Sequence, residues 1–342
     1  LANEAVVEGN ILSPSESGRF IAEHSHHVQL NSEGIEKLSV EMLKNTEENK
    51  LIISSTGTED IQPSRDHPKA ADWIFVTDTL NFCFWSQNKD LEWRVNGNTG
   101  YCALEAALYR ALKDGYDITN PDYYSKITSE DLSIIMKGDT DARIPLFNER
   151  LTVLHEVGAI LIDKYNSTFE TCILQANKSA VKLLQIIVSN FPCFRDEAVY
   201  KKQPVSLYKR AQILVADLWN CFGGQKWGEF HDIDKLTMFA DYRVPQVLVN
   251  YGVLSYSHEL MEKLKNNELL PCGSDEEVEI RGCSIHAVEL LKKRLEEKIR
   301  EEGKSVEVPN SSMIDYYLWC YRRKHAQEME NIPYHKTLGI FY

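Results

Sequence analysis

The chain has 342 residues, of which 43% are apolar and 26% are charged, and its formal net charge is −13. This length allows one large domain or two ordinary ones, and the composition is that of a soluble globular protein. The acidic balance argues against a long polyanion as the main partner, because phosphate contacts need clustered Lys and Arg, but a local basic pair can still hold one phosphate.

The sequence lacks the signals that are typical of secreted, membrane, metal-binding and cofactor-binding proteins. The N-terminal LANEAVVEGN has neither a basic region nor a long apolar stretch, so we expect a cytoplasmic protein without a secretory signal. Apolar runs such as LLQIIV at 183–188 are far shorter than a membrane span, so no membrane partner is expected. Eight dispersed Cys and ten dispersed His show no ligand spacing, and no nucleotide-cofactor motif occurs. We therefore expect neither a metal nor a cofactor.

Helical periodicity dominates the chain. SPSE at 13–16 is a capping box, in which Ser13 caps a helix and Glu16 reaches back. Further helices are predicted, in chain order, at 34–45, 99–115, 150–165, 179–191, 206–222, 283–303 and 313–329.

The remaining segments add little β-structure. LEWRV at 91–95 alternates and is followed by NGNTG, which predicts a hairpin. The aromatic run at 72–85 is compatible with a buried helix or a strand, and the polar stretch at 45–70 is predicted to be a loop. We expect a mainly α fold, with one domain over residues 1–342 and a small β-hairpin element.

One stretch, TMFADYRVPQ at 237–246, places an acidic residue directly before a predicted helix. Asp241 stands where an N-cap belongs, and Pro245 costs little in a first helical turn. Such an Asp can cap free N–H groups, or those groups can hold it ionised toward a ligand. Spacing alone favours the capping role.

Three carboxylates, Asp78, Asp241 and Asp315, lie among aromatic residues. A nucleobase site combines such groups, because rings stack on the base and carboxylates accept its N–H donors. The alternative, favoured for each position taken singly, is an N-cap beside core aromatics.

Two basic positions also stand out. Lys209 and Arg210 are adjacent on a predicted apolar helix, so they point about 100° apart and at least one is expected to face inward or across a cleft. The alternative is that both extend to solvent. Arg281 precedes the helix predicted at 283–303, and Gly282 allows close approach, which makes a candidate anion seat. Pairing of Arg281 with Glu279 is the alternative.

Seven stretches in order resemble the queuosine salvage family, the queuosine 5′-phosphate N-glycosylase/hydrolases. They are GRFIAEHS (18–25), FVTDTLNFCFWS (75–86), TGY (99–101), YKRAQILVADLW (208–219), TMFADYRVPQVL (237–248), VEIRGCS (278–284) and DYYLW (315–319). The resemblance implies a helical fold akin to DNA glycosylases. It also implies hydrolysis of the N-glycosidic bond of queuosine 5′-monophosphate, which releases queuine for reuse in tRNA modification. The Cys and His spacing adds the expectation that this hydrolysis is metal-independent.

The resemblance also implies roles for individual residues. The catalytic carboxylate falls on Asp241, the base-stacking ring on Phe239, and the queuine-contacting pair on Asp315 and Tyr316. Tyr242, Lys209 and Arg281 complete the expected substrate-binding set. The chain departs from the family at Cys320, where a second Asp is common. A base-contacting upstream His has no clear counterpart, and the loop near Glu59 or His67 is the expected replacement.

The implied leaving base is a 7-deazaguanine, which has no N7 to protonate. The site must then stabilise positive charge on the ribose, which a carboxylate does as nucleophile or as electrostatic partner and water base. Among the basic residues of the motifs we expect Lys209 to hold the phosphate, with Arg281 or Arg243 next. The alternatives are a carrier that binds the nucleotide without turnover and an enzyme acting on nucleic acid, which the net charge disfavours.

Overall fold

The computed structural model describes residues 9–47 and 63–342. Most of the loop predicted at 45–70, including Glu59, lies outside the described residues. Contacts between Cα atoms divide the chain into two compact units. Of the described residues, the first unit holds those up to position 47, Asp196–Lys209 and Leu236–Leu338, and the second holds the remainder. The single domain expected over residues 1–342 stays a prediction.

The first unit is built around one long helix, α13, against which four other helices pack. Its core is continuous and apolar, with residues such as Leu38, Val247 and Leu291 fully buried. The helices of this unit are α1 (Pro14–His24), α2 (Ser32–Glu47), α11 (Val244–Asn250), α12 (His258–Lys265), α13 (Asp275–Glu301) and α14 (Ser311–Lys324).

The start of α13 differs from the prediction at residue 283. Ser274 caps the helix, since its side chain accepts a hydrogen bond from the Glu277 backbone N–H. Three acidic residues fill the first turn and Lys298 and Arg300 lie in the last turn, an arrangement that complements the helix dipole. Arg281 therefore lies inside a helix, and its predicted place before a helix N-terminus was wrong.

Glycines bring α1 and α13 close together. A Cβ atom on Gly282 would lie 2.4 Å from Cδ1 of Ile21, and one on Gly18 would lie 2.7 Å from Cγ2 of Ile285. The absent side chain of Gly282 thus serves helix packing. The position therefore does not serve the approach of an anion, which the sequence suggested for this glycine.

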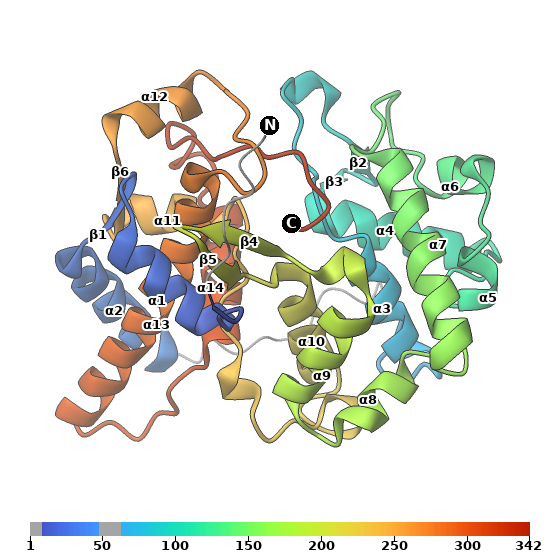
Figure 1. Ribbon diagram of the computed structural model, residues 1–342, viewed down its shortest axis with the longest axis horizontal. Helices are drawn as coiled ribbons and strands as arrows, with labels where there is room; N and C mark the ends of the chain where they lie inside the picture. Colours follow the sequence, from blue (N-terminus) through green and yellow to red (C-terminus); the bar gives the residue numbers. More distant parts are fainter. Residues whose placement is uncertain (1–8, 48–62) are drawn as a thin grey trace. The chain divides into compact units, whose positions relative to one another are not determined.

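The second unit is also helical (Figure 1). Its α-helices are α3 (Ala70–Thr79), α4 (Gly100–Lys113), α5 (Pro121–Tyr124), α6 (Ser129–Ile135), α7 (Phe147–Lys164), α8 (Glu170–Ala176), α9 (Ala180–Asn190) and α10 (Lys209–Cys221), the last beginning on the final residue of the first unit's segment. Its 3-10 helices are η1 (Lys89–Leu91), η2 (Pro192–Phe194), η3 (Lys226–Gly228) and η4 (Ile233–Lys235).

Strands form three two-stranded antiparallel pairs among the described residues. The predicted hairpin is confirmed as β2 (Arg94–Val95) and β3 (Asn98–Thr99), joined through Asn96 and Gly97 at φ 51° and 75°. The pairs that the sequence did not predict are β1 (Val28–Leu30) with β6 (Leu254–Tyr256) and β4 (Glu197–Tyr200) with β5 (Gln203–Ser206).

The mainly α fold is confirmed, while the likeness to DNA glycosylases stays a prediction. The capping box is confirmed, because Glu16 accepts a hydrogen bond from the Ser13 backbone N–H at 3.0 Å. The aromatic run at 72–85 is helical up to Thr79 and irregular beyond it. Within the described ranges, no helix has the length and apolar character needed to cross a membrane.

Candidate active site

The segment that leads into α11 places Asp241 just before the start of this helix. Its Oδ1 accepts hydrogen bonds from the backbone N–H groups of Arg243, at 3.0 Å, and Val244, at 2.9 Å. Asp241 thus binds free N–H groups at the start of the helix, as predicted, but α11 begins at Val244 and its N-cap position is Arg243, not Asp241. The side chain is partly exposed, so the capping carboxylate keeps a surface on which a ligand can act.

A second carboxylate holds the other end of the same short segment. Asp315, on α14, is 6% exposed, and its Oδ2 accepts the Phe239 backbone N–H at 3.0 Å. Phe239 is buried, and Asp315 holds its backbone directly, two residues before Asp241. The structure thus brings together Phe239, Asp241 and Asp315, which the sequence resemblance had grouped.

The two carboxyl groups differ in how firmly they hold a proton. Burial raises the pKa of Asp241, and Lys209, the two backbone N–H groups and Arg243 oppose that shift. Burial and then the charge of Asp241 raise the pKa of Asp315 well above its ordinary value. Asp241 is therefore the better candidate for the ionised member of the pair.

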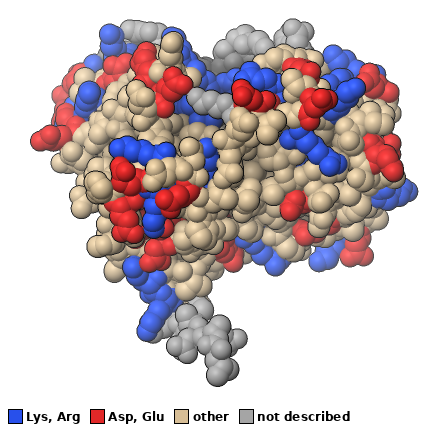
Figure 2. All heavy atoms as spheres, turned by 90° about the horizontal axis from the view of Figure 1, so that it is seen from above, with Lys and Arg blue, Asp and Glu red and all other residues tan. Residues whose placement is uncertain are grey.

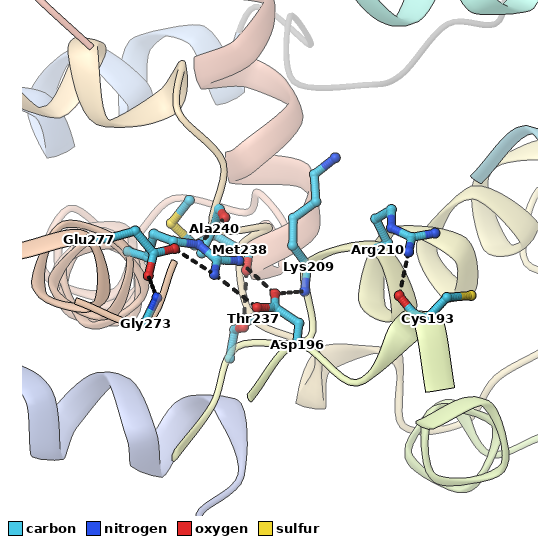
Figure 3. Close-up of polar contacts among 10 residues, drawn as sticks. Cys193, Asp196, Lys209, Arg210, Thr237, Met238, Ala240, Gly273 and Glu277 are labelled. Atoms are coloured by element: carbon cyan, nitrogen blue, oxygen red, sulfur yellow. Dashed lines mark hydrogen bonds and ion pairs between the residues drawn. The ribbon is translucent and has the colours of Figure 1, made fainter. Parts of the chain in front are cut away.

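Lys209 supplies positive charge to this pair. Its backbone N–H donates to Oδ2 of Asp196 at 3.0 Å, while its side chain extends away from Asp196 (Figure 3). The side chain is 7% exposed, and its charge lowers the pKa of both Asp241 and Asp315. The buried Lys209 side chain thus lies close enough to both carboxylates for its charge to act on them.

Arg281 lies behind the segment that carries Asp241. Its guanidinium donates to both oxygens of Asp196, at 2.8 and 2.6 Å, and to Glu277 at 3.2 Å (Figure 3). Its Nε donates to the Ala240 carbonyl at 2.9 Å. Arg281 therefore ties α13 to the residue before Asp241.

The alternative pairing of Arg281 with Glu279 was wrong. Glu279 accepts hydrogen bonds from the Tyr200 hydroxyl, at 2.8 Å, and from the His26 backbone N–H, at 3.0 Å. Glu277 and Arg281 are four residues apart and share a helix face, whereas Glu279 lies on another. The bidentate contact to Asp196 also disfavours Arg281 as a phosphate holder.

Arg210 belongs to the second unit and serves its packing. It is 1% exposed and donates to the carbonyls of Thr79, at 2.7 Å, Asp78, at 3.2 Å, and Cys193. The alternative that Lys209 and Arg210 both extend to solvent was therefore wrong. Asp78 is fully buried in this unit, and its Oδ1 accepts from the Asn81 amide at 3.1 Å.

The tyrosines predicted for the site lie in different surroundings. Tyr242 is buried, with its ring 5.5 Å from that of Tyr334. Tyr316 is 37% exposed, and its ring lies 6.1 Å from that of Trp319. Because neighbours on a helix point about 100° apart, Tyr316 does not share the face of Asp315, and its contact with the base stays a prediction. Cys320 is half-buried on the same helix.

Three residues near the site were not predicted from the sequence: Asp196, Gln246 and Arg322. Asp196 holds Arg281, and Gln246 accepts hydrogen bonds from Arg243 and Arg322. The sequence places these residues in no recognisable pattern, although Gln246 falls inside the motif at 237–248. In the part of the chain that the structure describes, no group of three or more His, Cys, Asp or Glu is arranged to hold a metal ion.

A carboxylate pair beside a buried ring and a cation, on a helical frame, is the arrangement of an enzyme that cleaves glycosidic bonds. Residues 61–342 match the family described as queuosine salvage protein, and the chain belongs to this family.

Curated relatives cover nearly all of the chain. A protein of Bos taurus named queuosine 5′-phosphate N-glycosylase/hydrolase is 44% identical over 338 residues, which cover 97% of this chain and 99% of the relative. A Mus musculus protein of the same name is 42% identical, with 98% and 100% covered. A Sphaerobacter thermophilus protein, also of this name, is 38% identical, with 85% and 87% covered.

Proposed function

We propose that this chain hydrolyses the N-glycosidic bond of queuosine 5′-phosphate and releases queuine for salvage into tRNA. The names of relatives that align over almost the entire chain support this activity and substrate. The observation that carries the proposal is Asp241, a partly exposed carboxylate fixed by two backbone N–H groups beside Phe239 and Lys209.

The reaction requires water to add to C1′ of the ribose while the bond from C1′ to the base nitrogen breaks. The bonding electrons leave with the base, whose nitrogen gains a proton, and the attacking water loses one. Because the base is a poor leaving group, positive charge grows on the ribose. Asp241 stabilises that charge, either as the nucleophile that bonds to C1′ or as the electrostatic partner and base for water.

The neighbours of Asp241 favour its ionised form. Two backbone N–H groups, Lys209 and Arg243 all lower its pKa against the effect of burial. Phe239 supplies a ring for the base, and Tyr242 lies directly after the catalytic residue. The cap of α11 and the catalytic group are then one side chain.

Asp315 is proposed to contact the base, with Tyr316 beside it. A guanine-like base presents an N1–H and an amino group, which an ionised carboxylate accepts. The raised pKa of Asp315 disfavours this form in the free protein. Binding of the two donors favours the ionised form, so Asp315 releases its proton when the base binds.

The alternative function is a carrier that binds the nucleotide without turnover. The test is mass spectrometry of queuosine 5′-phosphate incubated with purified protein, EDTA and no added cofactor, with Asp241→Asn as the control. We expect free queuine and ribose 5-phosphate from the wild-type protein. Intact nucleotide that stays bound would favour the carrier, and dependence on a metal would contradict the proposed mechanism.

The proposed partner is this free nucleotide, with no direct nucleic acid. Figure 2 shows basic and acidic side chains interspersed on the face in view, whereas nucleic-acid binding favours a basic stripe. A cytoplasmic location is proposed because the eight Cys are free thiols, as in a reducing compartment. A filter-binding assay with tRNA at physiological salt tests the first point, and we expect no retention.

A further inference from the structure

Two arginines beside Asp241 share one acceptor. Nη1 of Arg243 lies 3.3 Å from Oε1 of Gln246, and Nε of Arg322 lies 3.1 Å from the same oxygen. Gln246 is 3% exposed, and its amide nitrogen donates to the Ile332 carbonyl at 2.5 Å. This bond orients the amide so that its oxygen faces both guanidinium groups.

The surroundings of this pair are aromatic and basic. The guanidinium of Arg243 lies 4.0 Å from the ring centroid of Tyr334, and Nζ of Lys336 lies 5.2 Å from the same centroid. The ring of Tyr242 lies 5.5 Å from that of Tyr334. Two cations therefore lie over the ring of one tyrosine.

The positive charge of the arginine pair is not balanced by a contacting carboxylate. Across residues 9–47 and 63–342, neither Arg243 nor Arg322 forms an ion pair, and each side chain is only partly buried. Burial and then the charge of Arg243 lower the pKa of Arg322 to about 10, while Tyr334 and the charge of Asp241, which forms no ion pair with Arg322, oppose that shift. In a chain with net charge −13, two repelling guanidinium groups without a bound acid mark a place for an anion.

We propose that Arg243 and Arg322 hold the 5′-phosphate of the substrate, with the Tyr334 hydroxyl beside them. One guanidinium group comes from the residue before α11 and the other from α14. Together they match the several oxygens of a phosphate, whose charge removes their mutual repulsion. Arg243 lies two residues after Asp241. One nucleotide therefore presents its phosphate to the arginines and its C1′ to Asp241. The assignment rests on the proposed function, and it places this pair ahead of Lys209, whose charge acts on the carboxylates.

The decisive variant is Arg322→Gln, because Arg243 also lowers the pKa of Asp241. The matched control is Arg323→Gln, which removes the same charge from an exposed neighbour on α14 that lies 4.9 Å from the Trp319 ring. We expect Arg322→Gln to lower kcat/KM for queuosine 5′-phosphate by about 10–150-fold and to change kcat/KM for the unphosphorylated nucleoside little. The control should change neither.

Equal losses in Arg322→Gln and Arg323→Gln, or equal losses on nucleotide and nucleoside, would overturn the assignment. So would loss of the preference for nucleotide in Lys209→Met but not in Arg322→Gln. Arg322→Lys serves as the second variant, since it keeps the charge without the planar fork. It should retain wild-type melting and recover part of the lost kcat/KM.

A binding measurement separates this proposal from the proposed function. Ribose 5-phosphate, titrated by calorimetry, reports on the anion site without any turnover. We expect its affinity to fall about 10-fold or more in Arg322→Gln and to stay unchanged in Arg323→Gln. A wild-type protein that binds ribose 5-phosphate through Arg322 but releases no queuine would contradict the proposed function and leave the anion site unaffected. If the wild-type protein releases queuine and Arg322→Gln binds ribose 5-phosphate normally, the anion site is contradicted and the proposed function is unaffected.

Discussion

At the scale of single residues, Asp241 has a structural role, its hydrogen bonds at the start of α11, and a chemical role, its charge. One substitution distinguishes the two. One oxygen, Oδ1, accepts both backbone N–H groups, and an asparagine offers the same oxygen. Asp241→Asn should therefore cost no more than about 1 kcal/mol of the free energy of unfolding. Loss of the charge should slow turnover by about 10²–10³-fold or more.

Chemical denaturation and single-turnover kinetics on Asp241→Asn measure these two quantities, and nucleotide binding should be retained. Turnover within about threefold of the wild-type protein would remove Asp241 from the mechanism. A large loss of stability would instead show that the amide does not replace the cap.

Lys209 has a distinct electrostatic signature. Its charge lowers the pKa of Asp241, so Lys209→Met should raise that pKa. As pH falls, activity that needs ionised Asp241 is then lost at a higher pH than in the wild-type protein. The acid limb of the kcat profile therefore moves to higher pH. Lys201→Met, which removes an exposed lysine paired with Asp275, is the matched control. An unmoved acid limb in Lys209→Met would contradict the electrostatic role.

At the scale of elements, α13 supports the segment before α11 through a charged cluster. Arg281 is buried between Asp196 and Glu277 and donates to the Ala240 carbonyl. Arg281→Met leaves two buried carboxylates without the guanidinium that neutralises them, which costs about 3–5 kcal/mol. Asp196→Asn keeps an acceptor and leaves Glu277 to balance Arg281, so it should cost only about 1.5–3 kcal/mol.

Urea denaturation of the two variants measures this asymmetry. Equal destabilisation would mean that the cluster does not act through charge balance. Arg281→Met should also keep the preference for nucleotide over nucleoside, because the guanidinium of Arg281 is already bound to Asp196. A lost preference would restore Arg281 as a phosphate holder.

At the scale of the whole molecule, the raised pKa of Asp315 makes stability depend on pH. The unfolded chain releases this proton near pH 3.8, whereas the folded protein keeps it to a much higher pH. Between these values the folded state binds more protons, so the free energy of unfolding falls as pH rises. The contribution is at most about 1.4 kcal/mol per pH unit.

Asp315→Asn isolates this effect, since its amide oxygen still accepts the Phe239 N–H and stays neutral. Denaturation midpoints between about pH 4 and pH 7 should fall less steeply in the variant than in the wild-type protein. Parallel pH profiles would show that Asp315 titrates normally in the folded protein.

Local signals in the sequence determined the helical class and much of its detail. The capping box at Ser13, the turn at Asn96 and Gly97, and the cap at Asp241 all depend on contacts within three residues, so sequence spacing reveals them. SDEE at 274–277 is also typical of a helix start, at Ser274, whereas the apolar periodicity that predicted the helix begins later, at Cys283. The family resemblance, carried by motifs, identified Asp241 and Asp315 together.

Only the tertiary structure decided which partners the charged groups take. Arg281 meets Asp196 across 85 positions of sequence, Asp315 meets Phe239 across 76, and Arg322 meets Gln246 across 76. A guanidinium binds any acceptor that packing brings within about 3 Å, and no sequence spacing encodes that choice. For this reason the sequence ranked Arg281 among the phosphate holders and overlooked Arg322, while the folded chain gives Arg281 a carboxylate and leaves the charges of Arg243 and Arg322 for a ligand.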